Sequence, residues 1–291
     1  MLTMLSLSSA QLGAAAPSGA PYKSAAAGLP QELGLLILLL SVLLVVLRAR
    51  VVLELISRSD NRSHAKAFRW PTALRSFSGG LAAAYVLLLL LPELNVITAE
   101  LRGPRFLAFD LALLGLLVFK GIQHFCFRKV SSDFDSQGEW KFVGVKVAEK
   151  RSNFHISLGM FIAYTSLVLL TFPFQYSHLG GTVPVALYLV TFALHLGFDA
   201  LAVCEEDEHR FATLAPRIVA PILLAASILA ALEVLPTQIS LSAFAMLAGI
   251  VIYNVFQVEV RKPEDTSFIW FVIGALVFSL LGAFSFRGLL N

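Results

Sequence analysis

Charge is scarce in this chain of 291 residues, since Asp, Glu, Lys and Arg make up 14% of it and hydrophobic residues make up 57%. An ordinary soluble domain carries roughly 25% charged residues. So little charge cannot cover a water-facing surface of this size, and the mean hydropathy of +0.79 points the same way. The composition therefore excludes an ordinary soluble domain and predicts a surface that faces lipid.

Cysteines and catalytic motifs are also scarce. The two cysteines, Cys126 and Cys204, lie far apart and form neither a CxxC pair nor a disulfide framework. The apolar segments contain no HExxH motif, no Ser/His dyad and no paired catalytic carboxylates. A net charge of +3 is no nucleic-acid signature. We therefore expect no enzymatic activity, no resident cofactor and no nucleic-acid partner.

Long apolar segments dominate what is present. A transmembrane helix needs about 20 mostly apolar residues at a rise of about 1.5 Å each. Eight segments meet this requirement: 32–56, 72–92, 105–127, 153–173, 181–203, 214–235, 239–259 and 267–287. Pro92 and Pro236 are expected to end the second and sixth. The sequence thus predicts an all-α, polytopic membrane bundle of about eight transmembrane helices over residues 30–291, preceded by a disordered tail, 1–29.

The distribution of Lys and Arg predicts the orientation. The connections at 48–69, 128–151, 210–217 and 261–262 hold sixteen of these residues, whereas the other side holds four, Lys23, Arg102, Arg105 and Arg287. The positive-inside rule then puts both termini outside the cytoplasm. The longest cytoplasmic loop is 128–152, and its alternating pattern at 141–147 allows either a short strand or an interfacial helix.

Polar side chains at membrane depth are costly and are treated as functional candidates. Segment 181–203 carries Tyr188, Thr191, His195 and Asp199, whose spacing of three and four residues places them on one helix face. His195 and Asp199 are within reach of each other. Three uses stay open for this pair: a structural hydrogen bond, a proton relay, or a pair of metal ligands.

Further candidates lie on two other segments. Segment 239–259 carries Tyr253, Asn254 and Gln257, which either hydrogen-bond to a neighbouring helix or line a path together with the face of His195. His124 is a third potential metal ligand, beside Cys126 on segment 105–127.

Two segments of the chain carry similar residues in the same order. Residues 79–94 and 248–265 each begin with small residues, continue through a central tyrosine (Tyr85 or Tyr253) and leave through a Pro-Glu pair. Helices two and seven run in opposite directions in the predicted topology. The similarity is what an inverted repeat of helices one to three onto six to eight would give.

With these residues in view, the chain resembles the ZIP (Zrt/Irt-like) metal transporter family over roughly residues 32–288. The resemblance rests on the layout of the helices, the Pro92-Glu93-Leu94 ending of helix two and the Ala248-Gly249…Tyr253 start of helix seven. It implies a 3+2+3 arrangement of helices, both termini outside, and a transport site on helices four and five.

The family's helix five carries a His-Glu-x-Pro-His-Glu type motif. The corresponding residues here are His195-Leu196-Gly197-Phe198-Asp199-Ala200. The first His is kept, Asp199 stands in place of the second, and both Glu positions are apolar. The resemblance therefore implies a substrate that is a divalent metal or another cation, held at an atypical site.

Two functional hypotheses follow. The first is a ZIP-like transporter whose ion path contains His195, Asp199, Tyr188, Thr191, Asn254 and Gln257, with His195, Asp199 and His124 as candidate metal ligands. The alternative is a non-transporting membrane sensor, scaffold or assembly protein that keeps the fold. In both, the lipid bilayer is the main partner, and a homodimer stays open.

Overall fold

The computed structural model describes residues 30–62, 70–101, 103–104, 106–135, 142–179, 181–261 and 267–287, and they form helices and connections without strands. The predicted tail, 1–29, lies outside them. The helices are α1 (Gln31–Arg62), α2 (Trp70–Tyr85), η1 (Val86–Leu90), α3 (Leu91–Glu100), α4 (Leu107–Asp135), α5 (Phe142–His178), α6 (Thr182–Glu206), α7 (Glu208–Leu214), η3 (Ala215–Val219), α8 (Ala220–Ala231), α9 (Thr237–Arg261) and α10 (Phe268–Arg287).

Seven helical stretches within the described residues are long and apolar enough to cross a membrane. They are Gln31–Leu55, Thr72–Glu100, Leu107–His124, Phe154–His178, Thr182–Glu206, Glu208–Ala231 and Thr237–Val255. The eighth predicted segment is α10, whose described apolar part, Phe268–Ala283, is shorter. The all-α fold is therefore confirmed, as a multi-pass membrane bundle of seven long helices and one shorter one.

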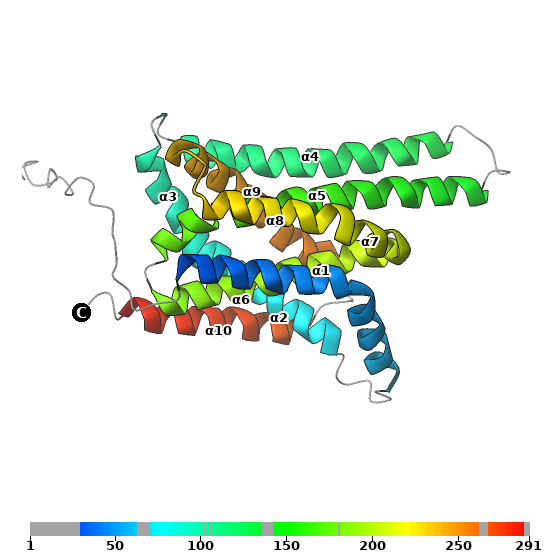
Figure 1. Cartoon of the computed structure of the whole chain (residues 1–291), viewed down its shortest axis with the longest axis horizontal. Helices are drawn as coiled ribbons and strands as arrows, with labels where there is room; N and C mark the ends of the chain where they lie inside the picture. The colour runs from blue at the N-terminus through cyan, green and yellow to red at the C-terminus, as the bar shows by residue number, and fades with distance from the viewer. Residues whose placement is uncertain are drawn as a thin grey trace, which may run out of the picture.

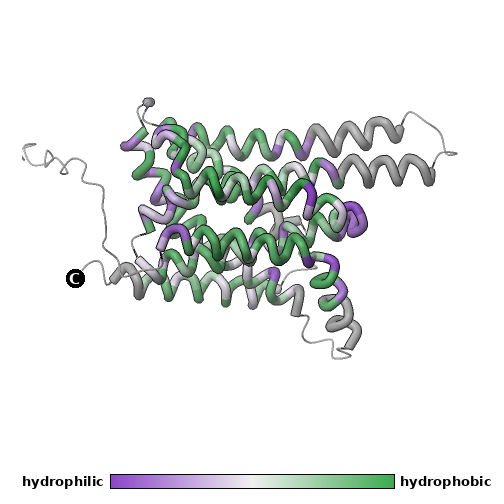
Figure 2. The backbone as a smooth tube through the Cα atoms, in the orientation of Figure 1, coloured by the Kyte–Doolittle hydropathy of each residue, from purple (hydrophilic) through white to green (hydrophobic). Residues whose placement is uncertain are grey.

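The outside of the bundle is apolar. Leu36, Leu40, Leu44 and Leu47 follow one face of α1 at helical spacing and are between 47% and 66% exposed. Figure 2 shows hydrophobic residues along the middle of the helices and hydrophilic ones mostly near their ends. Exposed leucines in such a row would be unfavourable in water, so this surface contacts the lipid bilayer.

The helices run roughly parallel and antiparallel along one axis. α1 begins and α10 ends at the same end of the bundle, whereas the α6–α7 connection lies at the opposite end (Figure 1). We call these the terminal end and the far end. Because the first and last helices meet at one end, the chain crosses the bundle an even number of times.

The predicted end of helix two at Pro92 is wrong. The helix passes through a π-helical turn, Val86–Leu90, and continues as α3 to Glu100. A proline lacks the N–H group of a regular helix and crowds the preceding turn. The wider turn takes up this change without a break, so Glu93 lies inside the helix rather than after it.

Other helix boundaries also differ from those predicted from the sequence. The sixth segment, predicted as 214–235, spans Glu208–Ala231, with a second π-helical turn, Ala215–Val219, beside its prolines. α5 continues through Pro173 to His178. Most of the predicted loop 128–152 consists of the ends of α4 and α5, so its backbone is helical there rather than extended.

Close contacts between helices pair them off. The most extensive pairs are α2 with α10, α4 with α9, α1 with α6, and α5 with α8. In the first two, glycines bring the backbones so close that a methyl group would collide with a carbonyl of the partner helix. The four collisions are Gly80 with Phe271, Gly274 with Phe77, Gly115 with Met246, and Gly249 with Ala112. Small residues serve this purpose in membrane bundles.

Candidate functional site

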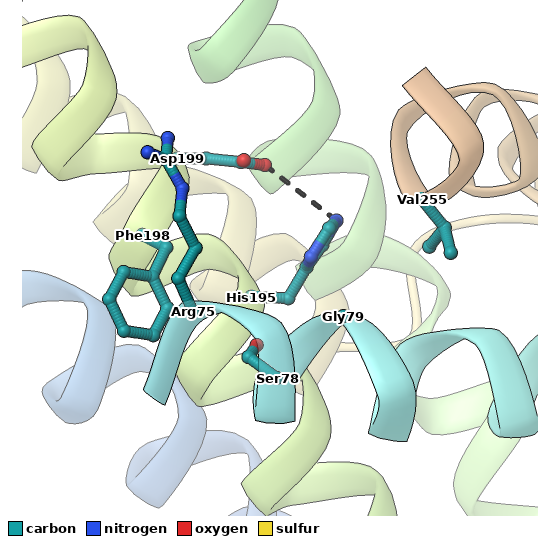
Figure 3. A pocket seen from close by; sticks show the side chains of 7 residues that line it. All are labelled: Arg75, Ser78, Gly79, His195, Phe198, Asp199 and Val255. Carbon is teal, nitrogen blue, oxygen red and sulfur yellow. Dashed lines mark ion pairs between the residues drawn. The ribbon is translucent and has the colours of Figure 1, made fainter. Parts of the chain in front are cut away.

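A small pocket opens between α2, α6 and α9. Its lining residues are Arg75, Ser78, Gly79, His195, Phe198, Asp199 and Val255, and its volume is about 20 Å³. Figure 3 shows Arg75 and Ser78 rising from α2 towards His195 and Asp199 on α6. A cavity of about 10–15 Å³ suffices for one water molecule. The pocket can therefore hold a water or a small ion, but no larger solute.

The His195–Asp199 pair is the most polar part of this pocket. Nε2 of His195 lies 3.9 Å from Oδ2 of Asp199, and the two side chains are 9% and 24% exposed. This separation exceeds the usual range of a hydrogen bond. Nε2 is buried and has no hydrogen-bond partner within the described part of the chain. The imidazole is thus held beside the carboxylate, with a nitrogen free to exchange a proton or bind a ligand.

A positive charge faces the same carboxylate. Arg75 of α2 interacts electrostatically with Asp199, and both line the pocket. A divalent metal normally needs three or four converging N, S or carboxylate ligands. The described residues contain no group of three His, Cys, Asp or Glu side chains that could hold a metal. Two ligands beside a guanidinium do not fit a divalent metal site.

Unpaired hydroxyl groups continue the polar region into the core. The ring of Tyr164 in α5 meets the ring of His195 edge-on, with 6.2 Å between ring centres. The side-chain oxygens of Tyr164, Thr165 and Thr191 are buried and lack a hydrogen-bond partner among the residues that the structure covers. Such buried groups are uncommon in folded proteins and are often functional.

The remaining predicted site residues do not gather at this pocket. Tyr188 and Thr191 are buried on α6, and Tyr188 contacts aromatic rings rather than the pocket. Asn254 is half-buried on α9, next to the pocket residue Val255. His124 is exposed on α4. The side chain of Gln257 lies outside the described residues.

Sequence reasoning missed Arg75 and Ser78. Arg75 could have been identified from the sequence, because a lone arginine inside an apolar segment is costly in a membrane and needs a counter-charge. Ser78 could not, since serines are common in membrane helices. Tyr164 lies in a stretch whose hydroxyl groups are visible in the sequence, but its contact with His195 depends on how α5 packs on α6.

No known protein family, characterised protein or solved structure matches the chain. The chemistry of the site therefore has to be argued from its own residues.

Proposed function

We propose that the protein is a ZIP-like membrane carrier that binds a cation at the His195–Asp199 pair. The observation that carries the proposal is the position of this pair, at the pocket in the interior of a lipid-facing bundle. A carboxylate and an imidazole at membrane depth are expensive to keep, and carriers use such pairs to bind and release cations.

The pairing of the helices supports an inverted repeat. Such a repeat would relate α1 to α8, α2 to α9, α4 to α10 and α5 to α6. Under this exchange, the α2–α10 pair becomes the α9–α4 pair, and the α1–α6 pair becomes the α8–α5 pair. The two glycine-lined crossings are exchanged in the same way. Inverted repeats are typical of secondary transporters, whose binding sites lie where the repeats meet. The same exchange would suit the 3+2+3 arrangement that the resemblance to the ZIP family implies.

The residues around the pair favour a proton or another monovalent cation over a divalent metal. Arg75 repels a dication, and the pocket offers one carboxylate and one imidazole. His124, the third predicted metal ligand, lies exposed on α4. The site therefore departs from the metal motif that the resemblance implies.

A transport assay tests the proposal. The full chain is reconstituted into liposomes, and uptake is followed for protons, Na⁺, K⁺, Mn²⁺ and Zn²⁺ in turn. We expect the protein to carry at least one of these cations. Asp199→Asn and His195→Ala should each lower that flux by about tenfold or more, because each removes a group that binds the cation.

Matched substitutions control for nonspecific effects. Asp110→Asn and His209→Ala alter an exposed carboxylate on α4 and an exposed imidazole on α7, so both should keep the wild-type flux. Wild-type rates in Asp199→Asn and His195→Ala, or the absence of any cation flux through monodisperse wild-type protein, would overturn the proposal.

The small size of the pocket favours the second candidate, a non-transporting sensor, scaffold or assembly protein. Its working surface would include segment 128–152, which joins α4 and α5. Deletion of 128–152 should then abolish the association with its partner, whereas Asp199→Asn should leave that association intact. A wild-type protein that carries a cation excludes this candidate as the sole function.

A further inference from the structure

The pocket contains hydrogen-bond donors that a cation cannot use. Three groups that can donate line it: the guanidinium of Arg75 and the hydroxyl of Ser78 from α2, and the imidazole of His195 from α6 (Figure 3). A guanidinium has five N–H donors and no acceptor. The carboxylate in the lining belongs to Asp199. The lining therefore offers an anion one positive charge and donors from two helices.

Two of these groups are buried without a partner. Ser78 is 2% exposed and His195 is 7% exposed. The side-chain oxygen of Ser78 and Nε2 of His195 have no hydrogen-bond partner among the residues that the structure describes. A buried polar group without a partner is costly. A ligand that accepts hydrogen bonds from both groups would remove this cost.

The hydroxyl of Ser78 differs from those of other serines in the bundle. Ser227 of α8 and Ser279 of α10 each donate to the carbonyl oxygen four residues earlier, over 3.0 and 2.7 Å. Serines within helices often make this bond. Ser78 does not make it, and Figure 3 shows its oxygen on the side of α2 that faces His195. The hydroxyl is therefore available to a ligand in the pocket.

The charge of Arg75 is also available. Asp199 forms its ion pair with His195, over 3.9 Å. Arg75 lines the same pocket but forms neither an ion pair nor a hydrogen bond with any residue in the described part of the chain. A guanidinium is weakly hydrated and well suited to binding anions in the interior of a protein. Its donors can therefore point to a small anion in the pocket.

The balance of charge links such an anion to a proton. The charges of Arg75 and Asp199 cancel when the pocket is empty. A proton on the His195–Asp199 pair leaves one net positive charge, which is costly in a membrane bundle, and an anion cancels it. Tyr164, the other titratable group beside the pair, is neutral at ordinary pH and does not change this count. A proton on His195 also makes Nε2 a donor to the anion.

We propose that the pocket binds a halide-sized inorganic anion between Arg75, Ser78 and His195, together with a proton on the His195–Asp199 pair. The inference rests on the proposed function, identifies its cation as the proton and adds a second substrate. The volume of about 20 Å³ accepts one small ion and excludes organic anions. One proton and one anion move in the same direction, so the site is neutral both empty and loaded.

A flux measurement with two anions tests the coupling. The full chain is reconstituted into liposomes loaded with a pH-sensitive dye, and a pH gradient is imposed in chloride or in gluconate, which is too large for the pocket. Acidification of the interior should be faster in chloride by about tenfold or more. Uptake of radioactive chloride should depend on the same gradient. A K⁺/valinomycin potential should leave both rates unchanged, because the two charges cancel.

Substitutions in the lining test the assignment of the anion site. Arg75→Gln removes the positive charge and should lower chloride uptake by about tenfold or more, whereas Arg75→Lys should restore part of it. Ser78→Ala should raise the chloride concentration for half-maximal uptake by about tenfold. The matched controls are Arg217→Gln, an exposed arginine of η3, and Ser227→Ala, whose hydroxyl bonds within its own helix. Both should keep the wild-type dependence on chloride.

The outcomes separate this inference from the proposed function. Equal proton flux in chloride and gluconate overturns the anion site and leaves the carrier in place. Unchanged chloride uptake in both Arg75→Gln and Ser78→Ala overturns the assignment to this pocket, and a rate that follows the membrane potential overturns the one-to-one coupling. A wild-type protein that carries Na⁺, K⁺ or a divalent metal but no protons overturns the inference alone. The absence of any cation flux through the wild type overturns both.

Discussion

The same separation recurs at both ends of the core: an imidazole nitrogen lies 3.9 Å from a carboxylate oxygen in the His195–Asp199 pair and in the pair His178–Glu93. Closer contact would make a hydrogen bond and fix one proton between the partners. A longer gap leaves each group able to bind its own proton. The two pairs differ in the imidazole: Nδ1 of His178 also lies 2.9 Å from the carbonyl oxygen of Phe174, whereas Nε2 of His195 has no hydrogen-bond partner among the described residues.

A hydrogen bond between helices gives a prediction at the residue scale. The hydroxyl of Tyr253 in α9 donates to Oε1 of Gln123 in α4, with 2.7 Å between oxygens. Tyr253→Phe should lower the free energy of unfolding in detergent by about 0.5–1.5 kcal/mol. Tyr164→Phe serves as the comparison, since its hydroxyl has no hydrogen-bond partner in the described part of the chain. An equal loss of stability in both variants would contradict the assignment of the bond.

Neighbours on one helix could be predicted from the sequence, whereas neighbours on different helices could not. The spacing of His195 and Asp199 alone places them one turn apart, and the structure has them 3.9 Å from each other. Arg75 and Tyr164 meet this pair only because α2 and α5 pack against α6. A hydrogen bond from Tyr253 to a neighbouring helix is one of the two uses that the sequence leaves open, and the structure has this bond, but its partner Gln123 could not be predicted.

At the scale of helices, Pro92 predicts a helix end at a position where the chain only changes its helical pitch. The rule that proline stops a helix reflects its missing N–H group and its steric clash. In a membrane the helix has a strong reason to continue, because unpaired backbone groups in lipid are costly. The π-helical turn Val86–Leu90 resolves the conflict and leaves Glu93 inside the bundle. The sequence therefore predicts Glu93 at a helix exit, whereas it lies within α3.

The glycine-lined crossings give a prediction at the same scale. Gly249→Ala would drive a methyl group of α9 into the backbone of Ala112 in α4. Overpacking of this kind costs about 1–3 kcal/mol, so the variant should unfold at a lower temperature in detergent. Gly121→Ala, also in this helix pair, places its methyl group in open space and should change the stability by less than about 0.5 kcal/mol. Equal stabilities of the two variants would contradict the close approach of α4 and α9.

At the scale of the whole molecule, the even number of crossings places the start of the first helix and the end of the last helix on the same side of the membrane. α1 begins and α10 ends at the terminal end, and the α6–α7 connection lies at the far end (Figure 1). In the topology predicted from the sequence, one side carries sixteen Lys and Arg residues and the other side carries four. The positive-inside rule then predicts that the far end faces the cytoplasm and the terminal end faces the opposite side.

This arrangement predicts where added tags can be reached. Tags before residue 30 and after residue 291 should both react with a membrane-impermeant reagent from outside intact cells. A tag inserted between α9 and α10, within 262–266, should react only after the membrane is permeabilised, because one crossing separates it from the C-terminus. Terminal tags on opposite faces would mean an odd number of crossings. Such a result would contradict the arrangement in which α1 begins and α10 ends at the same end of the bundle.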